Sequence, residues 1–249
     1  MMKHLCVDIG NTSIKLCLFS GFRRAKVHEI PTSAVKSCGR ILRTKFSGVI
    51  IDESIICSVV PAAERIIAPM IKKHTKKRHY CVGKNCFIRI PSAYQKGALG
   101  ADRLVALWGA LWKWKSPLII VSFGTAITID YINKAGKHCG GFIVPGLSAA
   151  TQALSNNTAQ LPPVRFKKDS AGCGTDTRTC IQRGIVQGTA YAVDGFVAQI
   201  KKKYGIAPVV IGIGGQARFM KRSCRSISYT DQYHVLESLN MVLMALAGR

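Results

Sequence analysis

Acidic residues are scarce in this chain. Its 249 residues include 36 lysines and arginines but only 12 aspartates and glutamates, which gives a formal net charge of +24. Such an imbalance suits nucleic acid, an anionic membrane surface or an anionic substrate such as a nucleotide. The basic residues, however, form several short clusters, and none is interleaved with aromatic residues as on a single-strand-binding face. We therefore expect a solvated basic surface and no nucleic-acid partner.

Long apolar runs are also absent. Hydrophobic residues make up 48% of the chain, enough for a globular protein with a sizeable core. The longest apolar passage, residues 118–129, is interrupted by Ser122, Gly124 and Thr125, so no segment reaches the length of a membrane span. Residues 1–10 lack the apolar core of a signal peptide. We expect a cytoplasmic protein with no membrane association.

Cysteine pairs at metal-binding or redox spacing are missing. The ten cysteines are scattered, mostly within apolar runs, and no Cys-x-x-Cys pair occurs. His79, Cys81 and Cys86 come nearest to a ligand cluster, but their spacing fits no zinc pattern. The sequence therefore predicts reduced, mostly buried thiols and no structural zinc.

Two common catalytic signatures do not occur. Gly83-Lys84 and Gly136-Lys137 are followed by Asn and His, so neither forms a Walker A loop, and there is no Gly-x-Ser-x-Gly elbow. A serine hydrolase therefore has little support. No Pro/Ser-rich linker divides the chain either, and we expect two α/β lobes of one compact body, residues 1–115 and 116–249.

Residues 5–19 have the pattern of two apolar strands joined by a polar turn. The turn carries Asp8, Gly10, Asn11 and Thr12. Glycine allows the backbone to approach a bound group, and successive N–H groups in such a turn can bind an anion, phosphate above all. The same residues are common in ordinary hairpins, so the stretch alone leaves both interpretations open.

A second copy of this pattern lies near the middle of the chain. Residues 121–130 align with residues 7–16 without a gap, so that Gly124 falls on Gly10 and Thr125 on Asn11. Two such hairpins favour a duplicated domain whose two turns face each other across a cleft. Chance similarity between hydrophobic hairpins is the alternative.

Two further segments complete the pattern. Asp102 and Arg103 fall in the first turn of a helix expected over residues 100–114, where a carboxylate and a bound anion are both favoured, although an ordinary helix start would look the same. Residues 208–217 read as a strand that ends in Gly214 and Gly215, a weak nucleotide-type turn. With Asp8 as a ligand for Mg²⁺, the set fits phosphoryl transfer from ATP to a small hydroxylated acceptor.

In their order, these motifs resemble the type III pantothenate kinases, within the superfamily of acetate and sugar kinases and actin-like ATPases. The resemblance runs nearly from end to end, and its individual motifs are weak while the ordered set is specific. It rests on residues 8–12, 58–61, 100–103, 124–126 with Thr128 and Asp130, 140–146 and 158–162. The fold implied is α/β, with duplicated actin-like ATPase (ribonuclease H-like) lobes and a nucleotide and substrate cleft between them.

The resemblance implies ATP-dependent phosphorylation of pantothenate to 4′-phosphopantothenate, the first step of coenzyme A biosynthesis, by a homodimer. Asp102 would be the general base, and Arg103 would hold the pantothenate carboxylate, for which a guanidinium fork is suited. Thr177 would reach the pocket from the partner subunit. The other implied contacts with the acceptor are Tyr94, Gly100 and Ala101.

The same resemblance assigns the ATP site. Asp8 would bind Mg²⁺, directly or through water, and Gly214 and Gly215 fall at the superfamily's adenosine motif. The implied phosphate-binding residues are Ile9, Gly10, Asn11, Thr12, Lys15, Gly124 and Thr125.

Several positions depart from the family pattern. The family usually has Asp where Ser122 stands, a carboxylate associated with the monovalent cation, K⁺ or NH₄⁺. Asp176 replaces a usual Asn, Ile213 an expected Thr, and the loop between Tyr94 and Asp102 is slightly short. The sequence therefore leaves an alternative beside the active kinase, a kinase-derived binding or regulatory protein that has lost turnover.

Overall fold

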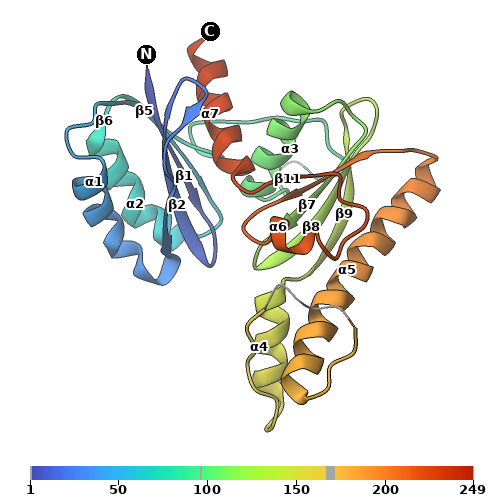
Figure 1. Ribbon diagram of the computed structural model, residues 1–249. Helices are drawn as coiled ribbons and strands as arrows, with labels where there is room; N and C mark the ends of the chain where they lie inside the picture. The colour runs from blue at the N-terminus through green and yellow to red at the C-terminus, as the bar shows by residue number, and fades with distance from the viewer. Residues whose placement is uncertain (1, 96, 167–171, 249) are drawn as a thin grey trace. The chain divides into compact units, whose positions relative to one another are not determined.

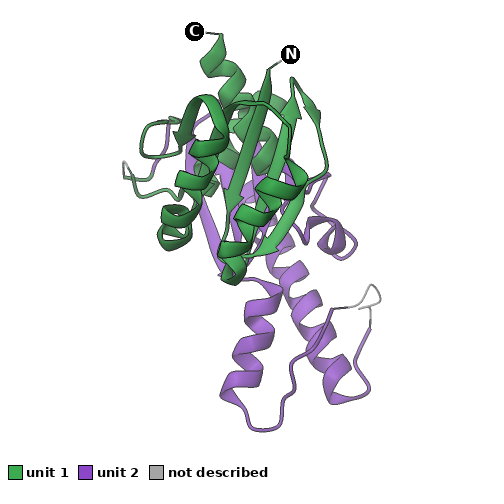
Figure 2. Cartoon of the chain, turned by 90° about the vertical axis from the view of Figure 1, so that its left-hand side faces the viewer, with its two compact units in different colours: residues 1–90, 94–113, 234–249 green, residues 91–93, 114–233 purple. Residues whose placement is uncertain are grey.

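The structure, a computed structural model, describes residues 2–95, 97–166 and 172–248. The chain divides into two compact units, coloured separately in Figure 2. Unit 1 comprises residues 1–90, 94–113 and 234–249, and unit 2 comprises residues 91–93 and 114–233. The main break lies between residues 113 and 114, beside the expected boundary at 115. Residues 234–249, which the sequence-based division placed in the second lobe, are grouped with unit 1.

Unit 1 is built on a six-stranded mixed sheet in the order β3-β2-β1-β5-β6, with β4 also paired to β2 (Figure 1). β1 runs antiparallel to β2 and parallel to β5. β1 and β5 lie in the interior of the sheet, and their nearly continuous apolar burial is typical of strands covered on both faces. The strands are β1 (Lys3–Ile9), β2 (Ser13–Ser20), β3 (Arg23–Arg24), β4 (His28–Pro31), β5 (Ile51–Ser58) and β6 (Thr75–Cys81).

Helices cover both faces of this sheet. Leu5 and Val7 belong to a core that β1 shares with α1 and α2. Because side chains alternate along a strand, His4 and Asp8 point to the opposite face. There His4 Nδ1 lies 2.8 Å from Oδ1 of Asn240 on α7. The elements are η1 (Thr32–Ser37), α1 (Cys38–Lys45), α2 (Pro61–His74), α3 (Ala101–Lys113), which packs on α7, and α7 (His234–Ala247).

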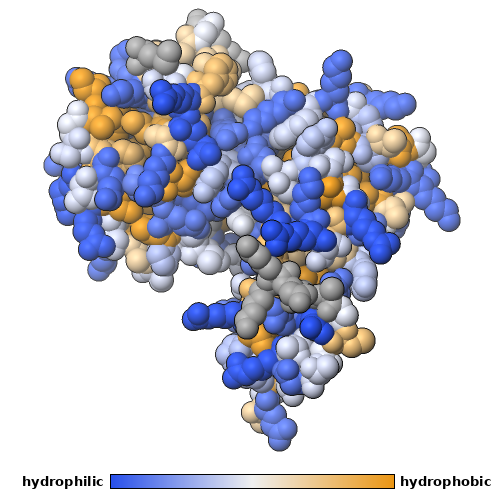
Figure 3. Space-filling model, viewed as in Figure 1, coloured by the Kyte–Doolittle hydropathy of each residue, from blue (hydrophilic) through white to orange (hydrophobic). Residues whose placement is uncertain are grey.

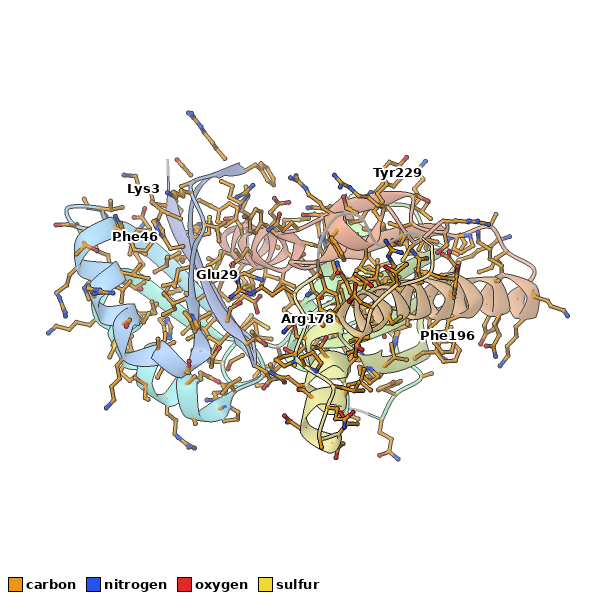
Figure 4. The ribbon with its side chains drawn as sticks, turned by 60° about the horizontal axis from the view of Figure 1, so that its bottom comes forward. Lys3, Glu29, Phe46, Arg178, Phe196 and Tyr229 are labelled. Atoms are coloured by element: carbon orange, nitrogen blue, oxygen red, sulfur yellow. The ribbon has the colours of Figure 1, made fainter. Side chains whose placement is uncertain are left out.

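Unit 2 contains a five-stranded sheet in the order β11-β10-β7-β8-β9. Its core is formed mainly by the sheet and the long helix α5, and Phe196 of α5, labelled in Figure 4, stacks on Phe142 with ring centroids 4.1 Å apart. The elements are β7 (Leu118–Phe123), β8 (Ala126–Ile132), β9 (His138–Pro145), α4 (Leu147–Asn157), α5 (Thr177–Tyr204), β10 (Val209–Ile213), α6 (Ala217–Met220) and β11 (Tyr229–Asp231).

The two sheets share one internal plan. In unit 1 the hairpin β1–β2 is followed by two parallel strands, giving the order β2-β1-β5-β6. In unit 2 the hairpin β7–β8 is flanked in the same way, giving β8-β7-β10-β11. The antiparallel and parallel relations match pair by pair. The structure therefore confirms the predicted hairpins and supports their origin in a duplicated unit.

Surface and cysteine chemistry agree with the composition. All ten cysteines are free thiols, and seven of them are buried. Hydrophilic side chains, blue in Figure 3, are spread over the face shown there. Among the described residues, no helix is both long and apolar enough to cross a membrane.

Candidate active site

Asp8 lies near the end of β1, on the sheet face opposite α1 and α2. It pairs in register with Lys15 of β2 and Cys57 of β5. Burial raises the pKa of its carboxyl from 3.8 to about 6; the charge of Lys15 works against this rise, whereas Asp102 and then Glu29 add to it. An ionised carboxylate in such a place gains when a cation binds, so Asp8 suits a metal ligand.

The turn that follows Asp8 is held from behind and open at its tip. Gly10 N donates to Ser13 O at 3.0 Å, and Thr32 Oγ1 donates to Gly10 O at 2.7 Å. Asn11 and Thr12 at the tip are exposed, whereas Ile9 is fully buried at the end of β1. The predicted phosphate turn of unit 1 is therefore rigid at its base and accessible at Asn11 and Thr12.

Lys15 lies on β2 directly opposite Asp8 of β1. Its Nζ lies 4.0 Å from Oε1 of Glu29 on β4. Glu29 is labelled in Figure 4. Glu29 carried no signal in the sequence, because only the pairing of β4 with β2 brings it opposite Lys15.

Asp102 and Arg103 occupy the first turn of α3, as predicted. Asp102 Oδ1 accepts a hydrogen bond from Arg103 N at 2.8 Å. An added Cβ on Gly100 would come within 2.9 Å of that oxygen, so a glycine leaves room for it. Ala101 begins the helix beside them. The charge of Asp102 contributes, after burial, to the raised pKa of Asp8.

Arg103 is oriented by Tyr94. Its guanidinium carbon lies 5.2 Å from the centroid of the Tyr94 ring, and its Nη2 donates to the Tyr94 hydroxyl at 3.3 Å. A guanidinium stacked in this way keeps a planar fork for a carboxylate. Although the loop is short, the structure brings Tyr94 and Arg103 together.

Unit 2 forms its own turn between β7 and β8. Gly124 and Thr125 are exposed there, and Gly146 N donates to Thr125 O at 3.0 Å. A Cβ on Gly146 would clash with Gly124 O and lie 2.6 Å from Thr125 O. Gly146 thus holds the predicted phosphate turn, a role that sequence reasoning missed because the contact depends on the pairing of β8 with β9.

The glycine turn after β10 meets the same end of the sheet. Gly214 has φ = +91°, and an added Cβ would lie 2.8 Å from Phe123 O at the end of β7. Both facts require glycine at this position. Gly215, in contrast, is exposed, and an added Cβ there would meet nothing within 4 Å.

Of the two remaining predicted residues, Ser122 lies just before the turn of unit 2 and Thr177 lies on a different element. Ser122 is the second-last residue of β7, in register between Thr128 and Ile213. Thr177 is the exposed first residue of α5, behind a capping box formed by Asp176 and Thr179. Thr179 N donates to Asp176 Oδ1 at 3.0 Å, so the Asp at 176 acts as a helix cap.

Similar solved structures define the class of fold. The chain matches a structure titled a conserved putative Baf family transcriptional activator from Campylobacter jejuni, with a TM-score of 0.61, 18% identity and 98% of each chain covered. It also matches a putative 2-dehydro-3-deoxygalactonokinase from Sinorhizobium meliloti, with a TM-score of 0.57, 13% identity and 98% and 96% of the two chains covered. The fold is the duplicated α/β fold of actin-like ATPases and sugar kinases.

Sequence relatives define the family. A family model described as type III pantothenate kinase matches residues 4–199. The type III pantothenate kinase of Syntrophus aciditrophicus is 33% identical over 247 residues, which cover 96% of this chain and 97% of the relative. The chain belongs to the type III pantothenate kinase family.

Proposed function

We propose that this chain transfers the γ-phosphoryl group of ATP to the primary hydroxyl of pantothenate, giving 4′-phosphopantothenate for coenzyme A biosynthesis. One observation carries the proposal. This chain is similar to a type III pantothenate kinase over nearly its whole length, and it has Asp8, Asp102 and Arg103 together in unit 1. Because these three groups are the ones that the chemistry demands, we favour catalysis over a regulatory protein without turnover.

Asp102 acts as the general base. Its Oδ1 is fixed by Arg103 N, and no described residue donates to its Oδ2, which is available for a proton. The carboxylate takes the proton of the acceptor hydroxyl as that oxygen bonds to the γ-phosphorus, and ADP leaves with the electrons of the broken P–O bond. Phosphoryl transfer needs little more from a side chain than this positioning and charge.

Arg103 holds the carboxylate of pantothenate. Its stacking on Tyr94 restricts the long side chain before the substrate arrives, which lowers the entropy lost on binding. Gly100 and Ala101 line the start of the same helix.

Mg²⁺ would be held by Asp8 together with phosphate oxygens of ATP. Magnesium in phosphoryl-transfer sites typically uses one or two carboxylates and keeps the rest of its shell for water and phosphate. The ion supplies neutralisation of phosphate charge. The raised pKa of Asp8 fits this role. The charge of Lys15 does not fully offset the effect of burial, so a bound cation would further stabilise the ionised carboxylate.

Phosphate groups would meet the two turns. In unit 1, Gly10 and Asn11 provide backbone N–H groups, Thr12 adds a hydroxyl and Lys15 adds a positive charge. In unit 2, Gly124 and Thr125 form the equivalent turn. Gly214 and Gly215 accept the adenosine end, since backbone without side chains allows close approach.

A homodimer completes the proposal. Tyr191 of α5 is 68% exposed, and at Gly184, Gly188 and Gly195 of the same helix an added Cβ would meet nothing within 4 Å. Exposed tyrosine is typical of interface centres. Thr177 would reach the partner's pocket. In sedimentation, Tyr191→Glu should shift the protein toward monomer, whereas Tyr229→Glu, a tyrosine that is 56% exposed on β11, should not; a wild-type monomer would refute the dimer.

The decisive experiment is ADP release with pantothenate beside a panel of other small hydroxylated acids, with and without K⁺ or NH₄⁺. We expect release with pantothenate and little with the other acids. Binding of ATP and pantothenate without ADP release at any cation concentration would refute the kinase.

A further inference from the structure

The chain crosses into unit 2 for three residues. Residues 91–93 belong to unit 2, although the segments before and after them belong to unit 1. We call residues 91–93 the crossover. His138, the first residue of β9, binds the crossover through both its backbone and its side chain. His138 N donates to Pro91 O at 2.9 Å, Ala93 N donates to His138 O at 2.8 Å, and Ser92 Oγ lies 2.9 Å from His138 Nδ1.

The other nitrogen of His138 meets a buried acid. His138 Nε2 lies 2.9 Å from Oδ1 of Asp130 on β8, and the two residues are 0% and 2% exposed. Burying a carboxylate and an imidazole is unfavourable unless both are hydrogen-bonded. An apolar pair would serve the packing of two neighbouring strands equally well. The polar pair therefore points to a need to fix the orientation of the His138 ring, and with it the bond to Ser92.

A hydrolytic use of this Ser–His–Asp arrangement does not fit its surroundings. His138 is completely buried, so no acyl substrate can reach the imidazole. The order of contacts is also reversed from that of serine hydrolases, because Nδ1 faces the serine and Nε2 faces the aspartate.

The residue next to the crossover belongs to the acceptor site. Tyr94 follows Ala93 directly in the chain, and in unit 1 it stacks on Arg103 and accepts a hydrogen bond from it. Only Ala93 separates Ser92 from Tyr94, so looser anchoring of Ser92 reaches Tyr94 through two peptide bonds. Tyr94 in turn restricts the guanidinium that we assign to the pantothenate carboxylate.

We propose that Ser92, His138 and Asp130 form a latch that positions Tyr94, and through Tyr94 the Arg103 guanidinium, for the acceptor carboxylate. The three are positioning residues, and the proposal rests on the proposed function for the identity of the acceptor and for the role of Arg103. The latch sets the affinity for the acid acceptor and leaves the ATP groups untouched.

Ser92→Ala tests the latch in the full-length protein. It removes one hydroxyl and keeps the His138–Asp130 pair. We expect the KM for pantothenate to rise about tenfold, as for a modest misplacement of a binding group, with kcat and the KM for ATP within about twofold of wild type. Ser92→Thr, which restores the hydroxyl, should return the KM close to wild type. Ser155→Ala is the matched control, because Ser155 Oγ donates to Gln152 O on α4, away from the crossover.

A second variant tests the link to His138. Glutamine at 138 keeps a donor for Asp130 but loses the ring nitrogen that meets Ser92, so His138→Gln should raise the same KM. The double variant should be no worse than the worse single variant, since both remove one interaction. Additive effects, equal changes in both KM values, or failure of Ser92→Thr to restore the KM would overturn the latch.

Hydrogen exchange gives a readout that does not depend on turnover. Ser92→Ala should speed amide exchange in a peptide spanning residues 97–103 and leave β7 and β8 unchanged, whereas Ser155→Ala should change neither. If the wild type proves inactive with pantothenate, the proposed function fails and exchange alone decides the latch. Unchanged exchange over 97–103 in Ser92→Ala would overturn it.

Discussion

Asp8 and Asp102 stand on different elements of unit 1, and the charge of Asp102 helps to raise the pKa of Asp8. Burial is the larger cause, and the cation of Lys15 only partly offsets both. The ionised Asp8 carboxylate is therefore disfavoured as long as no cation is bound. A bound cation would remove this penalty, so we expect Mg²⁺ to favour the ionised form of Asp8.

Asp8→Asn should stabilise the metal-free protein at neutral and alkaline pH. The folded pKa of about 6 lies above the ordinary 3.8, so the folded chain binds this proton more tightly than the unfolded chain. The wild type therefore loses stability as pH rises from about 4 to about 6, and the loss persists above that range. We expect Asp8→Asn to gain about 1–2 kcal/mol at pH 8 and to keep little of this gain at pH 4.

Thermal unfolding at several pH values measures this difference. Added Mg²⁺ at pH 8 should raise the Tm of the wild type and leave that of Asp8→Asn nearly unchanged. Asp52→Asn is a useful control. Asp52 Oδ2 accepts a hydrogen bond from Lys3 N, so weakening that bond should lower the Tm, whereas Asp8→Asn should raise it. A gain for Asp8→Asn that stayed the same at pH 4 and pH 8 would contradict the titration of Asp8.

Asp102→Asn should abolish turnover and largely spare ATP binding. The amide cannot accept the hydroxyl proton, and general-base groups typically contribute about 10²–10⁴-fold to the rate. The amide oxygen can still accept from Arg103 N, so the start of α3 should survive. Single-turnover kinetics and ATP titration separate the two effects. Turnover within a few-fold of wild type would show that Asp102 is not the base.

Local patterns were sufficient to predict the hairpins and the helix start. The turns at Gly10 and Gly124 and the place of Asp102 in the first turn of α3 follow from short-range periodicity and turn chemistry. The roles of Gly146 and His138 were not predictable, because both depend on which strands pair and which loop returns to them. The apolar face of α7 likewise indicated burial but not which unit it would join.

Gly146→Ala should loosen the phosphate turn of unit 2. The added methyl would clash with backbone oxygen atoms of Gly124 and Thr125, which have no rotamer to escape through. We expect a loss of about 2–3 kcal/mol in stability and weaker ATP binding. Gly215→Ala is the stability control, since its methyl would enter open space. Equal Tm values for the two variants would show that the turn tolerates the clash by shifting.

Ser122→Asp should create a dependence on monovalent cations that we expect the wild type to lack. A carboxylate at this position of β7, between Thr128 and Ile213, adds a full negative charge beside the turn that carries Gly124. K⁺ or NH₄⁺ would offset this charge, so the turnover of the variant should rise several-fold when either is added. Wild-type turnover should change little over the same range, because a serine hydroxyl carries no charge to be neutralised. Initial rates in sodium-free buffer with K⁺, NH₄⁺ or tetramethylammonium separate specific binding from ionic strength, since tetramethylammonium is too large for a compact oxygen site. Strong activation of the wild type by K⁺ would show that other oxygen ligands bind the cation without a carboxylate at 122.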